Sequence, residues 1–288
     1  MLTLGVAHWA ETAERIRGPL AARDIAVEHV SLTGETTHLG TESTQPAVDV
    51  GLCFPNRLLE GGVLTARLDI PWVNDREAVL RSRNKAETLA RLEAAGVPVP
   101  ETVLVSDPVD RDGLEAAFDA FDPPVVVKPN STTRGQGVFK VADSDSLSGA
   151  GDLFGLLHEF PAVRDRSYLL QEYLPDARDL RVMVIDGQVV GSVERSLPEA
   201  ARARGQWKHN VHRGAVATGI EPGKTVRTLA ERTAEVLDVP ILGVDILQQQ
   251  DRTIVLETNA RPTIDRQEKY DPSFYDRLAE TVRKTARE

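Results

Sequence analysis

The first 75 residues alternate short apolar runs with an amphipathic stretch. Three β-branched or aliphatic runs predict strands, namely Thr3–Ala7, Ile25–Val30 and Ala47–Cys53. The stretch between the first two, Glu11–Ala22, has helical spacing. This alternation is typical of an α/β unit. Ligands in open α/β sheets bind beyond the carboxyl ends of the strands, so Asn56 and Arg57 either meet a substrate or form an ordinary surface turn.

Two helices are predicted after this unit, over Asp75–Ser82 and from Asn84 to Gly96. Asn84 as the cap and Glu87 three residues later form a capping-box pattern. Lys85 then lies in the first helical turn, where a cation opposes the helix macrodipole. That unfavourable place indicates either a phosphate partner or a solvated lysine.

In the middle of the chain, strands are predicted over Thr102–Val105 and Val125–Val127, with a helix over Gly113–Phe121 between them. A polar loop, Asn130–Gly137, and a return strand, Val138–Val141, follow. The loop lacks the Gly-Lys-Ser/Thr of a Walker A motif. Its hydroxyl and backbone N–H groups can still close over phosphates, with Lys128 as a point charge, although a glycine loop alone is a weak signal. Ser144–Gly151 is predicted to be loop and Asp152–Phe160 a short helix.

The last third predicts a strand, a hairpin and two amphipathic helices: Tyr168–Gln171, Leu180–Val193, Thr225–Leu237 and Asp271–Arg287. The Asp186-Gly187 dipeptide in the hairpin is a strong turn signal. Trp207–Gly214 places five polar or basic residues in eight positions of a chain with a net charge of −10. Local positive charge in an acidic protein indicates an anionic ligand.

Two short aliphatic runs around a polar centre predict a further β-hairpin: Val244–Leu247 and Thr253–Leu256. Folding it about Asp251 sets Asp245 opposite Glu257, where like charges roughly 4.5–5.5 Å apart repel each other. A cation is therefore expected between them, and Asn259 adds a neutral oxygen on the same face. Two carboxylates and an amide without nearby His or Cys favour Mg²⁺. A solvated acidic hairpin face is the alternative.

Composition and charge narrow the classes of protein. At 288 residues, 41% hydrophobic and 27% charged, the chain is an ordinary globular protein that can hold more than one domain. No apolar run reaches the length of a membrane span, and Met1–Ala10 lacks the basic region of a signal peptide. The net charge of −10 argues against a nucleic-acid binder. Cys53, the single cysteine, fits a reducing cytoplasm and a buried structural thiol.

The order and spacing of several short motifs resemble the ATP-grasp superfamily and, within it, the RimK-like carboxylate–amine ligases. The matching segments, between about Pro71 and Pro262, are Val73-Asn74, Lys85, Lys128 with Gly135, Gln171-Glu172-Tyr173-Leu174, Asp179 with Arg181, Glu194-Arg195, Asn210–Gly214, and Asp245, Glu257 and Asn259. The resemblance implies an α/β (α+β) class and an ATP-grasp fold in three parts. These are an N-terminal α/β pre-ATP-grasp domain over 1–76, a central subdomain with the glycine-containing lid loop over 77–174, and a C-terminal subdomain with the metal site over 175–288.

The resemblance also implies a cytoplasmic, ADP-forming ligase that adds glutamate or another amino acid to a small molecule or a protein terminus, as a candidate homodimer. A substrate carboxylate attacks the γ-phosphorus of ATP, and an amine then displaces phosphate from the acyl phosphate. The implied metal ligands, for Mg²⁺ or in its place Mn²⁺, are Asp245, Glu257 and Asn259. The implied nucleotide-binding residues are Lys85, Lys128, Gly135, Gln171, Glu172, Tyr173, Leu174, Asp179, Arg181 and Lys208. The implied catalytic residues are Arg195, Asn210 and Arg213, and Lys208 and Arg213 are also candidates for the substrate carboxylate.

Two departures from the family pattern leave the substrate open. Glutamate-adding relatives commonly have Ser-Pro-Gly where this chain has Arg261-Pro262-Thr263, and Thr132 replaces a frequent lid glycine. The alternatives are a glutathione-synthase-like or D-alanine-ligase-like peptide ligase, and a nucleotide-binding scaffold without turnover. The intact set of lysines and metal ligands argues against a scaffold, which would be free to lose them.

Overall fold

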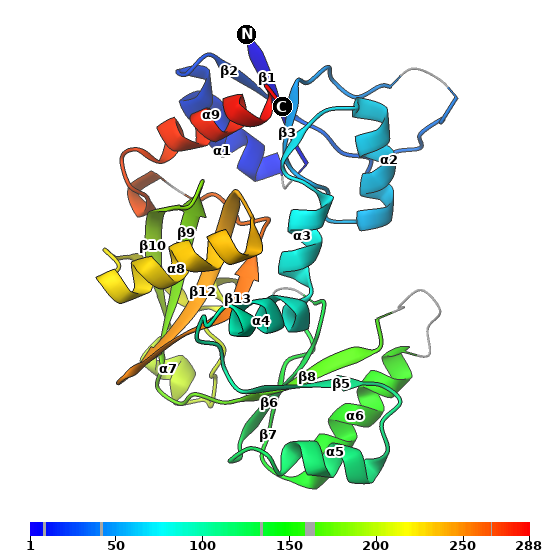
Figure 1. Cartoon of the computed structure of the whole chain (residues 1–288), viewed down its shortest axis with the longest axis vertical. Coiled ribbons are helices and arrows are strands. Elements are labelled where there is room, and N and C mark those ends of the chain that lie inside the picture. The colour runs from blue at the N-terminus through cyan, green and yellow to red at the C-terminus, as the bar shows by residue number, and fades with distance from the viewer. Residues whose placement is uncertain (8–9, 41–42, 133–134, 159–164, 266) are drawn as a thin grey trace.

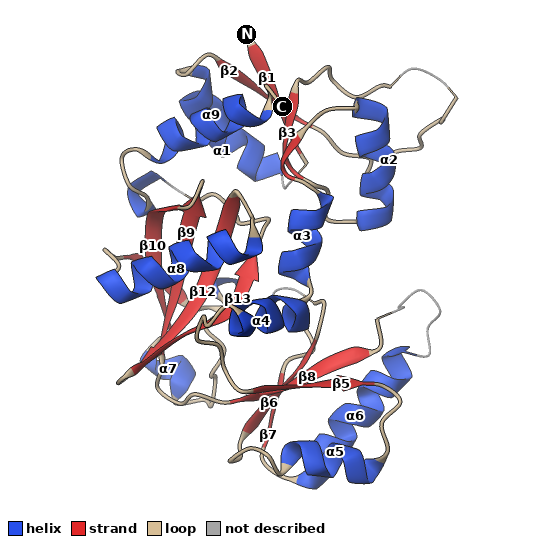
Figure 2. Ribbon diagram, viewed as in Figure 1, coloured by secondary structure: helices blue, strands red, loops and turns tan. Residues whose placement is uncertain are grey.

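The structure is a computed structural model of the chain, and it describes residues 1–7, 10–40, 43–132, 135–158, 165–265 and 267–288 (Figure 1). The strands of these residues form three sheets, each with its own helices (Figure 2). In Figure 1 the C-terminal sheet lies between the N-terminal sheet and the central sheet. The predicted mixed α/β class is confirmed.

The N-terminal sheet is parallel, with the strand order β2-β1-β3-β4. Its elements are β1 (Leu2–Val6), α1 (Ala10–Ala21), β2 (Ile25–His29), β3 (Val50–Cys53), α2 (Leu58–Leu68), β4 (Trp72–Asn74) and, from the far end of the chain, α9 (Phe274–Thr285). Helices α1 and α9 share one buried apolar core with β1 and β3 (Figure 1). The last helix, which falls in the predicted 175–288 segment, therefore packs on the first sheet.

The sequence analysis did not predict α2. Its Gly61-Gly62 pair lowers helix propensity. Gly61 is nevertheless required where it stands, because a Cβ there would lie 2.8 Å from the Phe54 ring. Close packing, rather than flexibility, accounts for this glycine.

The central sheet is antiparallel, in the order β5-β8-β6-β7. Its elements are β5 (Thr102–Ser106), α5 (Arg111–Phe118), β6 (Val125–Pro129), β7 (Phe139–Val141), α6 (Ser144–His158) and β8 (Ser167–Glu172). The predicted loop over Ser144–Gly151 is wrong, because α6 already begins at Ser144. Gly151 weakens the helical pattern, yet a Cβ there would lie 3.3 Å from Leu114, so the glycine lets α5 and α6 approach. Part of the predicted helix Asp152–Phe160 lies outside the described residues.

The C-terminal sheet is antiparallel, in the order β11-β10-β9-β12-β13. Its elements are β9 (Arg178–Ile185), β10 (Gln188–Ser196), α7 (Glu199–Arg202), η1 (Val211–Arg213), β11 (Val216–Gly219), α8 (Lys224–Leu237), β12 (Ile241–Gln249), β13 (Arg252–Asn259) and η2 (Gln267–Lys269). Asp186 and Gly187 both have positive φ, at 46° and 73°, which confirms the predicted β9–β10 turn. Helix α8 packs its apolar face on the sheet.

Two short helices join the N-terminal sheet to the rest, α3 (Arg76–Arg83) and α4 (Lys85–Ala94). Asn84 ends α3 and caps α4, where its side chain accepts a hydrogen bond of 3.2 Å from the backbone N–H of Glu87. The predicted cap is therefore confirmed, although the second bond of a capping box is altered: the Asn84 side-chain amide donates to the Glu87 carboxylate at 3.3 Å, while the Asn84 backbone N–H donates to Leu80. The cap at Asn84 therefore fixes where α4 begins, and with it the position of Lys85, the first residue of that helix. None of the described helices is both long and apolar enough to cross a bilayer.

Candidate active site

The β12–β13 hairpin places Asp245 opposite Glu257, as predicted. The strands turn between Gln249 and Arg252, half a residue before the predicted centre, and this alone would shift the pairing by one residue. A register shift between Asp245 and Ile246 restores the opposition of the two carboxylates. Such a bulge aims side chains that a regular ladder would not bring together.

Asp245 is 2% exposed and is surrounded by arginines. Arg181, directly opposite on β9, donates two hydrogen bonds of 2.6 and 2.7 Å to its carboxylate, and Arg195 adds a contact of 3.1 Å. Arg195 also donates to Asp179 at 2.9 and 2.5 Å, and His209 Nδ1 lies 3.3 Å from the same carboxylate. The negative charges of two carboxylates and the positive charges of two guanidinium groups thus offset one another within the sheet.

The pKa of Asp245 reflects two opposing effects. Burial alone would raise it, and the charges of Arg181 and Arg195 more than offset burial, so the pKa lies well below its usual value. An ionised carboxylate offers roughly four acceptor sites. Three are taken by the two arginines, so about one is left for a cation. Asp245 can therefore give a bound metal ion a single oxygen.

Glu257 and Asn259 complete the oxygen set on β13. Glu257 is half-buried beside Asp245, and the Asn259 Oδ1 accepts one hydrogen bond of 2.9 Å from the backbone N–H of Arg261. In the part of the chain that the structure describes, no three His, Cys, Asp or Glu side chains form a metal-holding group. Two carboxylates and an amide leave most of a Mg²⁺ shell to phosphate and water oxygens, as suits this ion.

Two lysines approach these carboxylates from other elements. Lys128, at the end of β6 and 5% exposed, donates to Gln171 Oε1 at 2.7 Å, and Gln171 donates to Thr102 at 2.8 Å. Lys85, at the start of α4, donates to the backbone carbonyl of Thr132. Burial lowers the pKa of Lys128 to about 8, Glu257 opposes this shift and Lys85 adds to it. Lysines from the central sheet and from α4 are therefore both within the electrostatic influence of a carboxylate of the C-terminal sheet.

The predicted hinge residues differ in what their side chains are free to do. Arg252 binds both carboxylate oxygens of Glu172, at 2.7 and 2.8 Å, and these hydrogen bonds lower the pKa of Glu172. The Tyr173 ring meets Trp207 edge-on, with centroids 5.7 Å apart, and Lys140 lies 4.7 Å from the Tyr173 centroid. Leu174 is buried in a small apolar cluster. The Glu172 carboxylate is thus engaged by Arg252, and the Leu174 side chain is packed among apolar groups.

The basic stretch reaches the glycine loop. Lys208 donates to the carbonyl of Val138 at 2.5 Å, and Arg213 donates to the carbonyl of Gly135 at 3.4 Å. Gly135 has a φ of +65°, and a Cβ there would lie 2.7 Å from Asn210 Oδ1, so only glycine fits. Thr133 and Arg134, within the predicted lid, lie outside the described residues. Basic groups and loop carbonyls are already in contact where an anion is expected.

The structure brings the predicted carboxylates and Arg195 together across β10, β9, β12 and β13 of the C-terminal sheet, and the charge of Glu257 acts on Lys85 and Lys128. Sequence reasoning missed Arg252, Thr102 and Arg83, whose partners lie 80, 69 and 27 residues away. No local pattern could have found these pairs, because each joins segments that are distant in the sequence: Thr102 and Gln171 are opposite each other on β5 and β8, and the other two pairs join different elements.

Solved structures with this arrangement of sheets are ATP-grasp ligases, which defines the class of the fold. D-alanyl-alanine synthetase A of Vibrio cholerae O1 biovar eltor matches 100% of this chain and 99% of its own, with a TM-score of 0.74 at 16% identity. The ATP-grasp ligase PsnB complexed with a minimal precursor matches 98% of each chain, with a TM-score of 0.67 at 20% identity. Both likenesses include the N-terminal sheet.

Residues 82–273 match the RimK-like ATP-grasp domain, and the chain belongs to this family. The resemblance inferred from the sequence is confirmed. A probable alpha-L-glutamate ligase of Stenotrophomonas maltophilia (strain K279a) is 31% identical over 194 residues, which cover 67% of this chain and 62% of that protein. The chain thus spans about three fifths of the length of this curated relative.

Proposed function

We propose that the protein is an ATP-dependent carboxylate–amine ligase that forms an amide or peptide bond and releases ADP and phosphate. One observation carries the proposal: Arg181 and Arg195 hold Asp245 opposite Glu257 on the β12–β13 hairpin, and the charge of Glu257 acts on both Lys85 and Lys128. A carboxylate and a triphosphate repel each other, so the reaction needs a site that neutralises charge and aligns the two anions. The family and its glutamate-ligase relative point the same way.

The reaction balances in two steps. A carboxylate oxygen attacks the γ-phosphorus, the bond to the β,γ-bridging oxygen breaks, and ADP leaves with that bond's electrons. An amine nitrogen then attacks the acyl carbon, the carbon–oxygen bond breaks, phosphate leaves and the nitrogen loses a proton. No nucleophilic side chain is required, in line with a site built from cations and carboxylates.

Each residue has a role that its surroundings support. Lys85 and Lys128 bind the phosphates, while Asp245, Glu257 and Asn259 hold Mg²⁺ or Mn²⁺, which supplies charge neutralisation when bound. The residues assigned to the γ-phosphate or acyl phosphate are Arg195, Asn210 and Arg213, with Lys208 as a further contact to an anionic substrate.

The remaining predicted nucleotide residues divide into binding and supporting groups. The main chain of Tyr173 and Leu174 contacts adenine, and Gly135 lets the lid approach. Gln171 orients Lys128, to which it is hydrogen-bonded, and Glu172 fixes the hinge through Arg252. Asp179 and Arg181 hold Arg195 and Asp245 in place.

The substrates we propose are amino acids or peptides. The relative is named a probable alpha-L-glutamate ligase, and PsnB was solved with a precursor. We further propose three functional parts over 1–76, 77–174 and 175–288, a cytoplasmic location in keeping with ATP consumption, and a homodimer. A D-alanine-type dipeptide ligase is the second candidate, because the likeness to D-alanyl-alanine synthetase A extends over the whole chain.

ADP and phosphate release by purified protein with Mg²⁺ and ATP tests the proposal across pools of amino acids, dipeptides and dicarboxylates. We expect release that depends on one pool and is lost in Glu257→Gln. Glu280→Gln, which alters an exposed carboxylate of α9, is the matched control and should retain activity. Binding of ATP with no release in any pool would indicate an acceptor outside these pools, such as a protein terminus, or a scaffold, and absence of ATP binding would refute the proposal.

A further inference from the structure

His209 lies beside the arginine–carboxylate network of the candidate active site. Its Nδ1 atom is 3.3 Å from the Oδ2 atom of Asp179, on β9. The Oδ1 atom of the same carboxylate accepts two hydrogen bonds from Arg195, on β10, at 2.9 and 2.5 Å. The imidazole and the Arg195 guanidinium therefore share one carboxylate. His209 thus neighbours the group assigned above to the γ-phosphate or acyl phosphate.

The residues on either side of His209 meet the glycine loop. Lys208 donates to the backbone carbonyl of Val138 at 2.5 Å, and the Asn210 Oδ1 lies where a Cβ on Gly135 would come within 2.7 Å of it. The side chain of His209 turns instead towards Asp179. The imidazole thus stands between the loop and the C-terminal sheet. Its side chain is 26% exposed, so a small molecule can reach it.

The contact with Asp179 decides which nitrogen of the ring can take up a proton. An ionised carboxylate only accepts hydrogen bonds, so the ring nitrogen that faces it, Nδ1, carries a hydrogen. In a neutral imidazole the other nitrogen, Nε2, is then unprotonated and has a free lone pair. Asp179 therefore orients the ring with its basic nitrogen directed away from that carboxylate.

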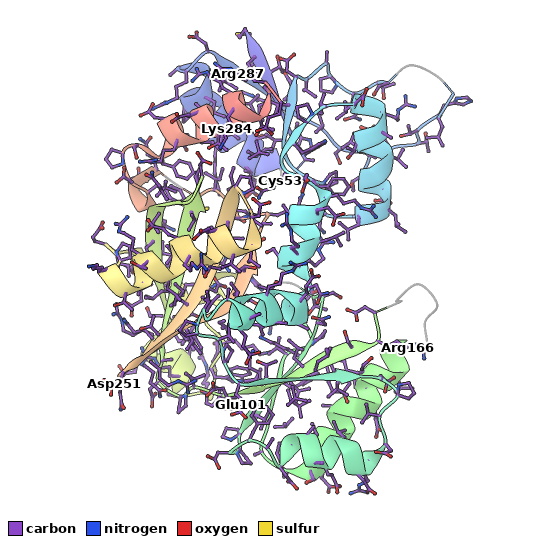
Figure 3. The ribbon with its side chains drawn as sticks, in the orientation of Figure 1. Cys53, Glu101, Arg166, Asp251, Lys284 and Arg287 are labelled. Carbon is purple, nitrogen blue, oxygen red and sulfur yellow. The ribbon has the colours of Figure 1, made fainter. Side chains whose placement is uncertain are left out.

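The carboxylate at the hinge is already engaged. Glu172 binds Arg252 through both oxygens and accepts a hydrogen bond of 2.9 Å from the backbone N–H of Glu101. Figure 3 labels Glu101 and, next to Arg252 in the sequence, Asp251 at the tip of the β12–β13 hairpin. A carboxylate held in this way favours its ionised form and is a weak base, so Glu172 is a poor proton acceptor.

The carboxylates of the C-terminal sheet are engaged as well. Arg178 binds both oxygens of Glu194, at 3.2 and 2.8 Å, and these hydrogen bonds lower the pKa of Glu194. Asp245 and Glu257 are assigned to the metal ion. Two imidazoles remain among the described groups of this region, and the imidazole is the usual base of neutral solution. His212 is exposed on η1, whereas His209 faces the network.

We propose that His209, oriented by Asp179, is the proton acceptor of the amide-forming step. The inference rests on the proposed function and adds a catalytic residue to it. As the amine nitrogen bonds to the acyl carbon, one N–H bond breaks, its electron pair stays on nitrogen and the proton moves to Nε2. The carbon–oxygen bond of the acyl phosphate breaks, and phosphate leaves with its electrons. The partly exposed imidazole then releases the proton to water before the next turnover.

Nitrogen NMR of the imidazole ring tests its orientation without any substrate. The protein is labelled with nitrogen-15 histidine, and the resonances of His209 are identified by their absence from His209→Asn. We expect the neutral ring of His209 to carry its hydrogen on Nδ1. A neutral ring with its hydrogen on Nε2 would overturn the inference, because that nitrogen could not then accept a proton.

His209→Asn also separates the two half-reactions. Asparagine keeps an N–H donor near the place of Nδ1 and has no atom in place of Nε2. The carboxylate probes are N-acetyl-L-glutamate and N-acetyl-L-glutamyl-L-glutamate, which lack a free amine, and L-glutamate is the amine. Amide formation should fall about 100- to 10,000-fold, the range for one general base. Positional isotope exchange in ATP without the amine should stay within about threefold of the wild type, because no proton leaves in that step.

Two further histidine variants serve as comparisons. His29→Asn, at an exposed position at the end of β2, is the matched control and should leave both half-reactions unchanged. Equal losses of exchange and amide formation in His209→Asn, or no loss of amide formation, would overturn the inference. A loss confined to amide formation in His212→Asn, with His209→Asn unaffected, would overturn it as well. No exchange in the wild type with either acid would contradict the proposed function, whereas the ring tautomer is measured independently of it.

Discussion

Replacing Asp245 with Asn tests the buried charge network most severely. The change removes a negative charge that is 2% exposed: Arg195 keeps its hydrogen bonds to Asp179, while Arg181 loses the carboxylate to which it donates two hydrogen bonds. Removing one partner of a buried ion pair costs about 3–5 kcal/mol. At about 2–4 °C per kcal/mol for a chain of this order of size, the melting temperature should fall by roughly 6–20 °C.

Urea unfolding followed by circular dichroism, with EDTA and no nucleotide, measures this cost apart from any metal contribution. The double variant Asp245→Asn/Arg181→Gln removes one charge of each sign and should be less destabilised than the sum of the single variants, by about 0.5–3 kcal/mol. Loss of less than about 1 kcal/mol in Asp245→Asn would contradict the network, because it is the size of an exposed ion pair. Additive single and double variants would also contradict it.

Three further predictions concern the lysine, the thiol and the hinge. Burial lowers the pKa of Lys128 to about 8, so Mg–ATP affinity should fall roughly tenfold between pH 7 and pH 9 as the ammonium loses its proton, and Lys128→Arg should flatten this profile in a binding titration. A Lys128 pKa near its usual value would leave affinity constant over this range. Because Cys53 is buried and its pKa is raised to about 11, a thiol reagent at pH 8 should label it slowly in native protein and fast in urea. For the same reason the free energy of unfolding should fall as pH rises from 9 towards 11. Fast labelling of the native protein would place the thiol at the surface. Because Arg252 already binds both oxygens of Glu172, Glu172→Gln should change ATP affinity by less than about threefold, the effect of a weak exposed pair, and a larger change would mean that this carboxylate contacts the nucleotide.

The sequence predicted local features that depend on neighbouring residues. The helix cap at Asn84 and the turn at Asp186 follow from side chains within three residues, and both are confirmed. The opposition of Asp245 and Glu257 was predicted from a regular hairpin, but the structure reaches it through an earlier turn and a compensating bulge. A bulge has no reliable mark in one sequence, so this agreement depended on two departures that cancel.

Features that depend on contacts between segments distant in the sequence were not predicted. The sequence placed Arg181 among the nucleotide-binding residues and did not predict that its guanidinium binds Asp245 from the adjacent strand. The segment ending at Gly151 was predicted to be loop because glycine lowers helix propensity, whereas the structure shows that this glycine lets α6 pack closely on α5. Helix α9 completes the first sheet from the other end of the chain, which apolar spacing cannot show. Long-range contacts, rather than local propensity, decide these cases.

Positional isotope exchange in ATP is the most direct test of the proposed acyl phosphate. ATP that carries oxygen-18 in the β,γ-bridge is incubated with the protein, Mg²⁺ and the stimulating carboxylate, without any amine. The account predicts that the label moves into the non-bridging β-positions, that this requires the carboxylate, and that Glu257→Gln abolishes it. Exchange without a carboxylate, or amide formation with no exchange under any carboxylate, would contradict the account.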